Sequence, residues 1–373
     1  PDPAMPSPHV VTHAAPDFGR RSPGTSGLRR PTAEFRAPHY LATFAAAILG
    51  EAVPRRGATL VLGGDGRTFV AEAVQQILKL AAAWGVERTI VGQGGLLSTP
   101  AASHLIRLRG AVGGIILSAS HNPGGPEGDF GIKYNGANGG PVPPAVTDAI
   151  AARAEALREY QLLDHPDVPL DRIGTSQLGT MVVEVIDPVA DYATLMESLV
   201  DVAAIRALFG RGFTMRFDAM HAVTGPYAVE LLERRCGAPA GTVVRGTPLP
   251  DFGGEHPDPN LVHAAELVEA VMHHIEQGME PKAATLQAMK EVSGPVVAIA
   301  LILTAVFVPV GFIPGITGSF YQQFAITIAI SVLLSAFNAL TLSPALAALL
   351  LKAPTGKRTF LTPFYDWFNR VFG

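Results

Sequence analysis

Stretches with apolar residues at helical spacing alternate with short aliphatic runs along the first half of the chain. The helical stretches cover residues 36–50, 68–84, a segment that opens at 99–100, and 144–160. The runs expected to form buried strands are 58–62, 88–91 and 111–117. Because crossover helices join neighbouring strands side by side, this alternation predicts a mainly parallel sheet in an α/β domain over residues 36–160.

A second α/β pattern follows a polar connector at 161–180. Strands are expected at 181–185, 213–218 and 242–245, with helices over 188–208 and up to residue 235. The pattern stops soon afterwards, at a helix over 261–271. Residues 161–271 are therefore expected to form a partial second domain of the same class, with a mixed or parallel sheet that lacks strands.

The last quarter of the chain is apolar. No charged residue or histidine occurs from Val292 to Leu351. This uncharged stretch is long enough for two helices that cross a bilayer. Basic residues lie outside both ends of this stretch, whereas the connecting loop at 311–318 has none, so both ends are expected in the cytoplasm. We therefore expect an amphipathic helix over 272–292, a transmembrane hairpin over 293–352 and a C-terminal tail over 353–373. The alternative is a soluble apolar hairpin.

Composition indicates which partners and which cellular location fit the rest of the chain. Residues 1–35 are rich in proline, alanine, serine and glycine, which predicts a flexible N-terminus. The net charge of −4 and the lack of a basic patch argue against a nucleic-acid partner. The single cysteine, Cys236, forms no internal disulfide, and no secretory signal is evident, so a cytoplasmic location fits the soluble part.

The strongest chemical signal is Ser-Ala-Ser-His-Asn-Pro-Gly-Gly at 118–125, directly after the strand at 111–117. Ligands bind at the carboxyl ends of strands in open α/β sheets, so a nucleophile is expected here. A serine hydroxyl needs a neighbouring base or cation, and His121 and Lys133 are the nearby titratable groups for Ser118 or Ser120. The alternative is an ordinary strand-to-loop turn.

Two further turns suit phosphate. Residues 23–30, Pro-Gly-Thr-Ser-Gly-Leu-Arg-Arg, combine backbone donors, hydroxyls and guanidiniums, although a flexible basic turn would look the same. The Gly-Gly-Asp-Gly-Arg turn at 63–67 has neither P-loop spacing nor the dinucleotide fingerprint, so no nucleotide site is expected there. For Asp65 and Arg67 a supporting structural role is favoured over direct substrate contact.

These motifs, together with 131–136 and 139–142, resemble the active-site segments of the α-D-phosphohexomutases, most closely the phosphoglucomutases. The resemblance covers residues 20–270. It implies that Ser120 carries a phosphoryl group, passes it to glucose 1-phosphate and regains one from glucose 1,6-bisphosphate, yielding glucose 6-phosphate. His121 and Lys133 would then be acid/base and charge-stabilising residues.

The same resemblance assigns a substrate loop and a cofactor. Thr25, Ser26 and Arg29 would bind the phosphosugar, and Mg²⁺ would contact the phosphate on Ser120. However, the family's Asp-Gly-Asp-Gly-Asp-Arg metal loop does not follow the helix at 261–271. The paired histidines at 273–274 do not replace it, because adjacent positions on a helix do not share a face.

From residue 268 to 352 the sequence instead resembles the resistance-nodulation-division efflux transporters, through motifs at 280–285, 292–295, 307–310 and 341–346. The positions that align with that family's proton-relay aspartates are Val262 and His263, so proton-coupled transport is not expected. The combined prediction is a phosphoglucomutase-like phosphotransferase, inactive or crippled as a fragment and anchored in the inner membrane. The alternative is a membrane-anchored binding protein or a transporter fragment from a gene fusion.

Overall fold

The computed structural model describes residues 9–16, 27–258 and six isolated positions: 301, 302, 305, 325, 330 and 331. Except for those six positions, three predicted segments therefore lie outside the described residues: the helix at 272–292, the hairpin at 293–352 and the tail at 353–373. Within the described ranges, no helix combines the length and the apolar character needed to cross a bilayer.

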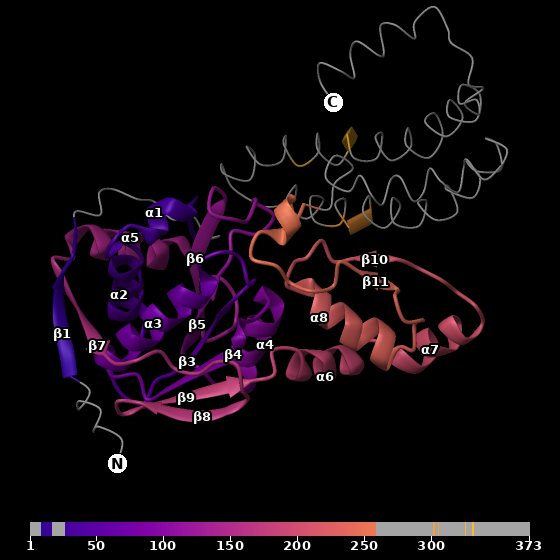
Figure 1. Ribbon diagram of the computed structural model, residues 1–373, viewed down its shortest axis with the longest axis horizontal. Coiled ribbons are helices and arrows are strands. Elements are labelled where there is room, and N and C mark those ends of the chain that lie inside the picture. The colour runs from indigo at the N-terminus through magenta and orange to yellow at the C-terminus, as the bar shows by residue number, and fades with distance from the viewer. Residues whose placement is uncertain are drawn as a thin grey trace, which may run out of the picture. The chain divides into compact units, whose positions relative to one another are not determined.

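A seven-stranded mixed sheet forms the centre of the first unit (Figure 1). The strand order is β2-β6-β5-β3-β4-β9-β8. The four central strands, β5, β3, β4 and β9, are parallel, and antiparallel strands flank them on both sides. The bounds are β2 (Leu28–Pro31), β3 (Thr59–Gly64), β4 (Arg88–Leu96), β5 (Gly113–Leu117), β6 (Asp129–Gly136), β8 (Gly174–Leu178) and β9 (Met181–Ile186). The predicted mixed α/β class is confirmed.

Helices cover both faces of this sheet. One core joins α2 (Tyr40–Ala52), α3 (Val70–Trp84) and α5 (Pro144–Ala156) to one face, with the short α1 (Thr32–Arg36) at its margin. The other face packs against α4 (Thr99–Leu108). As the proline at position 100 predicts, α4 begins there, and Ser98 caps it by accepting a hydrogen bond from the Ala101 amide at 3.3 Å. A separate antiparallel pair joins β1 (His9–Ala14) to β7 (Glu159–Asp164).

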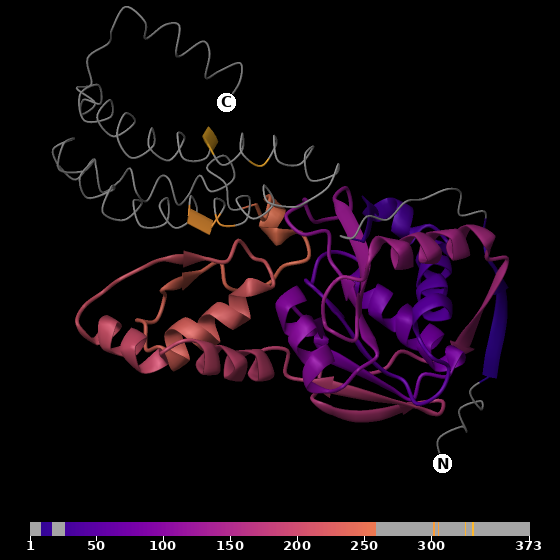
Figure 2. The same ribbon diagram turned by 180° about the vertical axis from the view of Figure 1, so that it is seen from behind.

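The strand predicted at 181–185 exists, but its expected place in the second unit was wrong. It is β9, which pairs in parallel with β4 and antiparallel with β8 (Figure 2). The reason is packing, since Met181 and Val183 are fully buried in the first core. The sheet of the first unit therefore extends well beyond residue 160.

The rest of the described chain forms a smaller α/β unit. It contains α6 (Ala190–Leu199), α7 (Val202–Gly210), β10 (Phe217–Asp218), α8 (Thr224–Ala228), a π-helix (Val229–Arg235), β11 (Val243–Val244) and a 3₁₀ turn (Phe252–Gly254). The parallel strands β10 and β11 have only two residues each, shorter than predicted.

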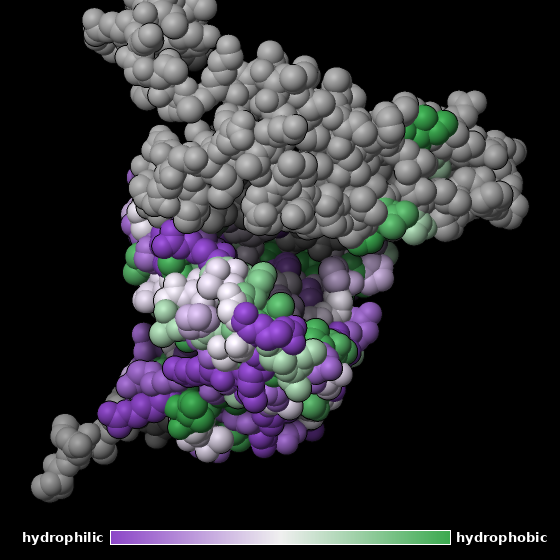
Figure 3. Space-filling model, turned by 90° about the vertical axis from the view of Figure 1, so that its right-hand side faces the viewer, coloured by the Kyte–Doolittle hydropathy of each residue, from purple (hydrophilic) through white to green (hydrophobic). Residues whose placement is uncertain are grey.

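The local core of this second unit is small. Among the described residues it is formed by Phe209, Cys236 and Ala238 with a few partly buried neighbours. Leu199 and Phe213 of the same unit are 66% and 45% exposed. Figure 3 shows apolar side chains, in green, among polar ones on the described part of the surface. Among the described residues, the apolar cluster of the second unit is thus smaller than the core of the first.

Candidate active site

The predicted nucleophile turn leaves the carboxyl end of β5. The Ser118 amide donates to the Gly131 carbonyl on β6 at 2.9 Å, and the Ser120 amide donates to Ser118 Oγ at 3.0 Å. Ser120 is exposed and has a φ of 60°, in the left-handed region that a residue with a side chain rarely adopts. Such strain persists only where neighbouring groups hold the backbone in place.

His121 contacts the hydroxyl of Ser120. Its Nδ1 atom lies 3.5 Å from Ser120 Oγ, and the imidazole is exposed. This is a long contact, but catalytic hydrogen bonds are often long before a substrate binds. The structure therefore brings together the serine and histidine that the sequence pairs.

Arg67 holds the turn from beneath. Its side chain is fully buried, and its Nε donates to both carboxylate oxygens of Asp65, at 3.1 and 3.0 Å. Its Nη2 donates to the Ser120 carbonyl at 2.7 Å, and its Nη1 donates to the carbonyls of Asp129 at 2.8 Å and Asn122 at 3.4 Å. Arg67 thus fixes the backbone conformation of Ser120, which agrees with the supporting role favoured from the sequence.

Lys133 lies on β6, opposite Ile116 of β5. Within the described residues its ammonium makes no hydrogen bond or ion pair. Burial lowers the pKa of Lys133, the positive charge of Arg29 lowers it further, and the carboxylate of Asp65 partly opposes the shift. A poorly solvated cation beside a second cation is well suited to attract a phosphate group.

Replacing Lys133 with methionine should therefore stabilise the fold by about 1 kcal/mol at neutral pH. Because the folded-state pKa of Lys133 is lowered, its unfavourable contribution is complete below that pKa and vanishes as the pH rises past its ordinary value of 10.5. The stability gap between variant and parent, measured by urea unfolding, should close over that range. A less stable Lys133→Met variant at neutral pH would contradict this assignment.

Arg29 reaches the same edge from β2, where it pairs with Gly131 of β6. Its Nε is buried and has no hydrogen-bond partner among the described residues. Gly27, just before it, has a φ of 90°, and a Cβ there would lie 2.5 Å from the Ile132 carbonyl oxygen. This close approach carries the predicted substrate loop past β6, while Thr25 and Ser26 themselves lie outside the described residues.

The described residues do not fit the Mg²⁺ expected at Ser120. They contain no group of three or more His, Cys, Asp or Glu side chains arranged to hold a metal ion. Of the carboxylates that belong to this network, Asp65 binds Arg67, and Asp129 accepts a 2.7 Å hydrogen bond from Asn122 Nδ2. Both carboxylates are therefore engaged by protein groups.

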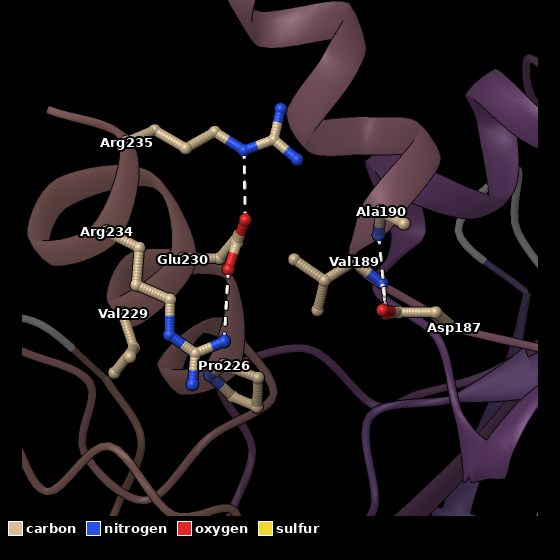
Figure 4. A pocket seen from close by; sticks show the side chains of 8 residues that line it. All are labelled: Asp187, Val189, Ala190, Pro226, Val229, Glu230, Arg234 and Arg235. Atoms are coloured by element: carbon tan, nitrogen blue, oxygen red, sulfur yellow. Dashed lines mark hydrogen bonds and ion pairs between the residues drawn. The ribbon is translucent and has the colours of Figure 1, made fainter.

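A separate cavity of about 430 Å³ lies beside the π-helix (Figure 4). Figure 4 shows Glu230 between Arg234 and Arg235, with the Asp187 carboxylate accepting hydrogen bonds from the amides of Val189 and Ala190. These ion pairs already balance the charges within the cavity. It is therefore a weaker candidate for an anionic substrate than the Ser120 turn.

Comparison with known proteins separates the chain into two parts. Residues 20–161 match the family described as phosphoglucomutase/phosphomannomutase, alpha/beta/alpha domain I, and residues 263–373 match the AcrB/AcrD/AcrF family. A phosphoglucomutase from Rhizobium radiobacter is 54% identical over 263 residues, covering 70% of this chain and 48% of that protein. Human phosphoglucomutase-1 is 45% identical over 273 residues, with coverages of 70% and 49%.

A solved structure leads to the same family. The open form of the Paramecium phosphoglucomutase parafusin has a TM-score of 0.67 and 40% identity, covering 73% of this chain and 51% of that one. The chain thus spans about half the length of the curated relatives it matches. Both sequence resemblances are confirmed: residues 20–161 match the first α/β/α domain of the phosphoglucomutase/phosphomannomutase family, and residues 263–373 match the AcrB/AcrD/AcrF family.

Proposed function

We propose that the N-terminal part of the chain is a phosphoglucomutase-like phosphotransferase in which Ser120 accepts a phosphoryl group from glucose 1,6-bisphosphate. The observation that carries this proposal is the exposed Ser120 hydroxyl, presented by a left-handed turn that buried Arg67 fixes. His121 at 3.5 Å and the cation pair of Lys133 and Arg29 supply the accompanying chemistry. The named relatives support the choice of a phosphosugar as the substrate class.

In the proposed step, Ser120 Oγ forms a bond to the phosphorus of the bisphosphate while the bond from that phosphorus to the sugar oxygen breaks. The serine proton passes to His121 Nδ1, which later releases it to solvent, and the sugar oxygen takes up a proton from water and leaves as a hydroxyl. Lys133 and Arg29 neutralise the oxygens of the transferred group. Such a transition state depends mainly on positioning and on charge neutralisation.

We expect one transfer rather than rapid turnover. The described residues offer no fitting site for Mg²⁺, and the Asp-Gly-Asp-Gly-Asp-Arg metal loop does not follow residues 261–271. The products of a single transfer are phosphorylated Ser120 and a glucose monophosphate. The continuous interconversion of glucose 1-phosphate and glucose 6-phosphate should be very slow or absent.

The test is to incubate the full chain with glucose 1,6-bisphosphate carrying radioactive phosphate, with and without added Mg²⁺. Incorporation into the tryptic peptide that contains Ser120, located by mass spectrometry, is the expected result. No incorporation under either condition would eliminate the phosphotransferase and leave a protein that only binds a phosphosugar.

A second proposal concerns the location of the chain. We propose that residues 293–352 insert as a hairpin in the inner membrane, with the phosphotransferase part in the cytoplasm. The match of residues 263–373 to a transporter family and the absence of charge from Val292 to Leu351 support it. The full chain should resist extraction from membranes by alkaline carbonate. A Leu303→Arg, Leu334→Arg double variant should be released, because a charged residue at the bilayer centre is costly.

A further inference from the structure

A backbone carbonyl of the second unit anchors two loops of the first. The Pro250 oxygen accepts hydrogen bonds from the Thr68 amide at 2.8 Å, from Thr68 Oγ1 at 3.1 Å and from the Gly125 amide at 3.4 Å. Thr68 follows Arg67 directly, and Gly125 ends the Ser-His-Asn-Pro-Gly-Gly motif. One carbonyl therefore ties both segments that shape the nucleophile turn.

The ring of Phe252 fills the space beside this anchor. Phe252 is 2% exposed although its backbone has a φ of 56° and it lies in a short 3₁₀ turn. The Arg67 guanidinium lies over the ring, 5.2 Å from its centre. A Cβ on Gly124 would lie 2.8 Å from a ring carbon and 2.9 Å from the Pro250 oxygen. The glycine at 124 is thus required by the close approach of the ring.

We propose that Pro250 and Phe252 form a clamp through which the second unit positions the Ser120 turn for phosphoryl transfer. The proposal rests on the phosphotransferase function proposed above. The physical path is continuous: the Phe252 ring packs against Arg67, and Arg67 donates to the Ser120 carbonyl at 2.7 Å. Phe252 is a positioning residue, and its ring makes the turn rigid rather than reacting itself.

The clamp gives the second unit a role in the chemistry of the first. A loop in a strained conformation needs contacts at several points. Arg67 holds the Ser120 carbonyl, and the ring of Phe252 packs closely against Gly124. Loss of the ring should therefore loosen the turn without removing any group that touches the substrate.

The first test compares Phe252→Ala with the parent chain in two measurements. Hydrogen exchange of the peptide spanning 118–125 should accelerate, and the first-order rate of Ser120 labelling at saturating bisphosphate should fall about tenfold. The bisphosphate concentration that gives half the maximal rate should stay the same, because Arg29 and Lys133, the groups proposed to hold the phosphate, are unchanged. Phe252→Leu, which keeps apolar bulk, should recover part of the rate.

The matched control is Phe213→Ala, which removes the same ring from an exposed position of the same unit. It should leave exchange at 118–125 and the labelling rate unchanged. Exchange of the peptide spanning 227–236 reports whether the second unit stays folded in each variant. A loosened turn together with an unchanged 227–236 peptide would attribute the effect to the clamp.

The second test is a double-mutant cycle with Gly124→Ala. The added methyl should disturb the turn in the parent chain, but should cost less where Phe252→Ala has removed the ring it meets, while the close approach to the Pro250 oxygen remains. Additive effects on exchange would overturn the clamp, as would unchanged exchange at 118–125 in Phe252→Ala. Hydrogen exchange is measured without substrate, so it tests the clamp even if the chain takes up no label. Absence of labelling would refute only the phosphotransferase function.

Discussion

Ser120→Ala should take up no phosphoryl group from glucose 1,6-bisphosphate under conditions that label the parent chain. The substitution removes the only atom proposed to bond to phosphorus, while the backbone contacts of the turn can remain. These contacts are the donation from the Ser120 amide to Ser118 Oγ and from Arg67 to the Ser120 carbonyl. The loss should therefore be complete, and the measured quantity is radioactive phosphate in the 118–125 peptide.

Ser118→Ala is the matched control for this prediction. Ser118 also carries a hydroxyl, but its oxygen accepts a 3.0 Å hydrogen bond from the Ser120 amide. Removing it should cost about 1 kcal/mol of local stability and slow the labelling without abolishing it. Equal labelling of Ser120→Ala and the parent, or loss confined to Ser118→Ala, would assign the nucleophile to another residue.

The elements predicted well from the sequence are those whose own residue pattern shows which side chains are buried. The aliphatic run at 58–62 and the amphipathic segment at 68–84 correspond to β3 and α3, because one forms the buried centre of the sheet and the other has a single apolar face. β6 went unrecognised as a strand. Its sequence, Asp-Phe-Gly-Ile-Lys-Tyr-Asn-Gly, contains polar residues and glycines that serve the site rather than the core.

Strand order was the harder part to predict. β9 follows the polar connector in sequence, so it was placed with the second unit, whereas it pairs with β4. Nothing in its own residues distinguishes these alternatives, because both offer it a buried position. Which sheet β9 joins depends on the hydrophobic side chains that the first sheet offers it, and these contacts cannot be identified from a single sequence.

Some residues of the candidate site could be predicted from their neighbours in the chain, and others could not. Ser120 and His121 are neighbours in the chain, so their pairing was visible at once, and Arg67 follows a glycine-rich turn that suggested a supporting role. Phe252 gave no local signal, since its contact with Gly124 joins segments far apart in the sequence. The role of Pro250 likewise appears only in the fold, where its carbonyl meets Thr68 and Gly125.

Substitution of Arg67 should have a large effect on folding as well as on labelling. Arg67→Met leaves the Asp65 carboxylate, of a residue 7% exposed, without its guanidinium partner, and leaves the carbonyls of Ser120 and Asp129 without their donor. Breaking a buried ion pair on one side costs about 3–5 kcal/mol. The loosened Ser120 turn should also lose more than about 100-fold in labelling rate, because the nucleophile is no longer held in place.

The control for Arg67 is Arg88→Met. Arg88 also pairs with a carboxylate, that of Glu184 at 2.9 Å, but its side chain is 47% exposed. An exposed pair of this kind contributes less than about 1 kcal/mol, so Arg88→Met should unfold in urea close to the parent and be labelled at the parent's rate.

A second change separates charge from positioning. Asp65→Asn added to Arg67→Met removes the unpaired charge and should restore part of the lost stability. It should not restore the labelling, because the carbonyl of Ser120 still lacks its donor. Recovery of labelling in the double variant would mean that Arg67 acts only by neutralising Asp65, and the idea that it fixes the nucleophile turn would then be wrong.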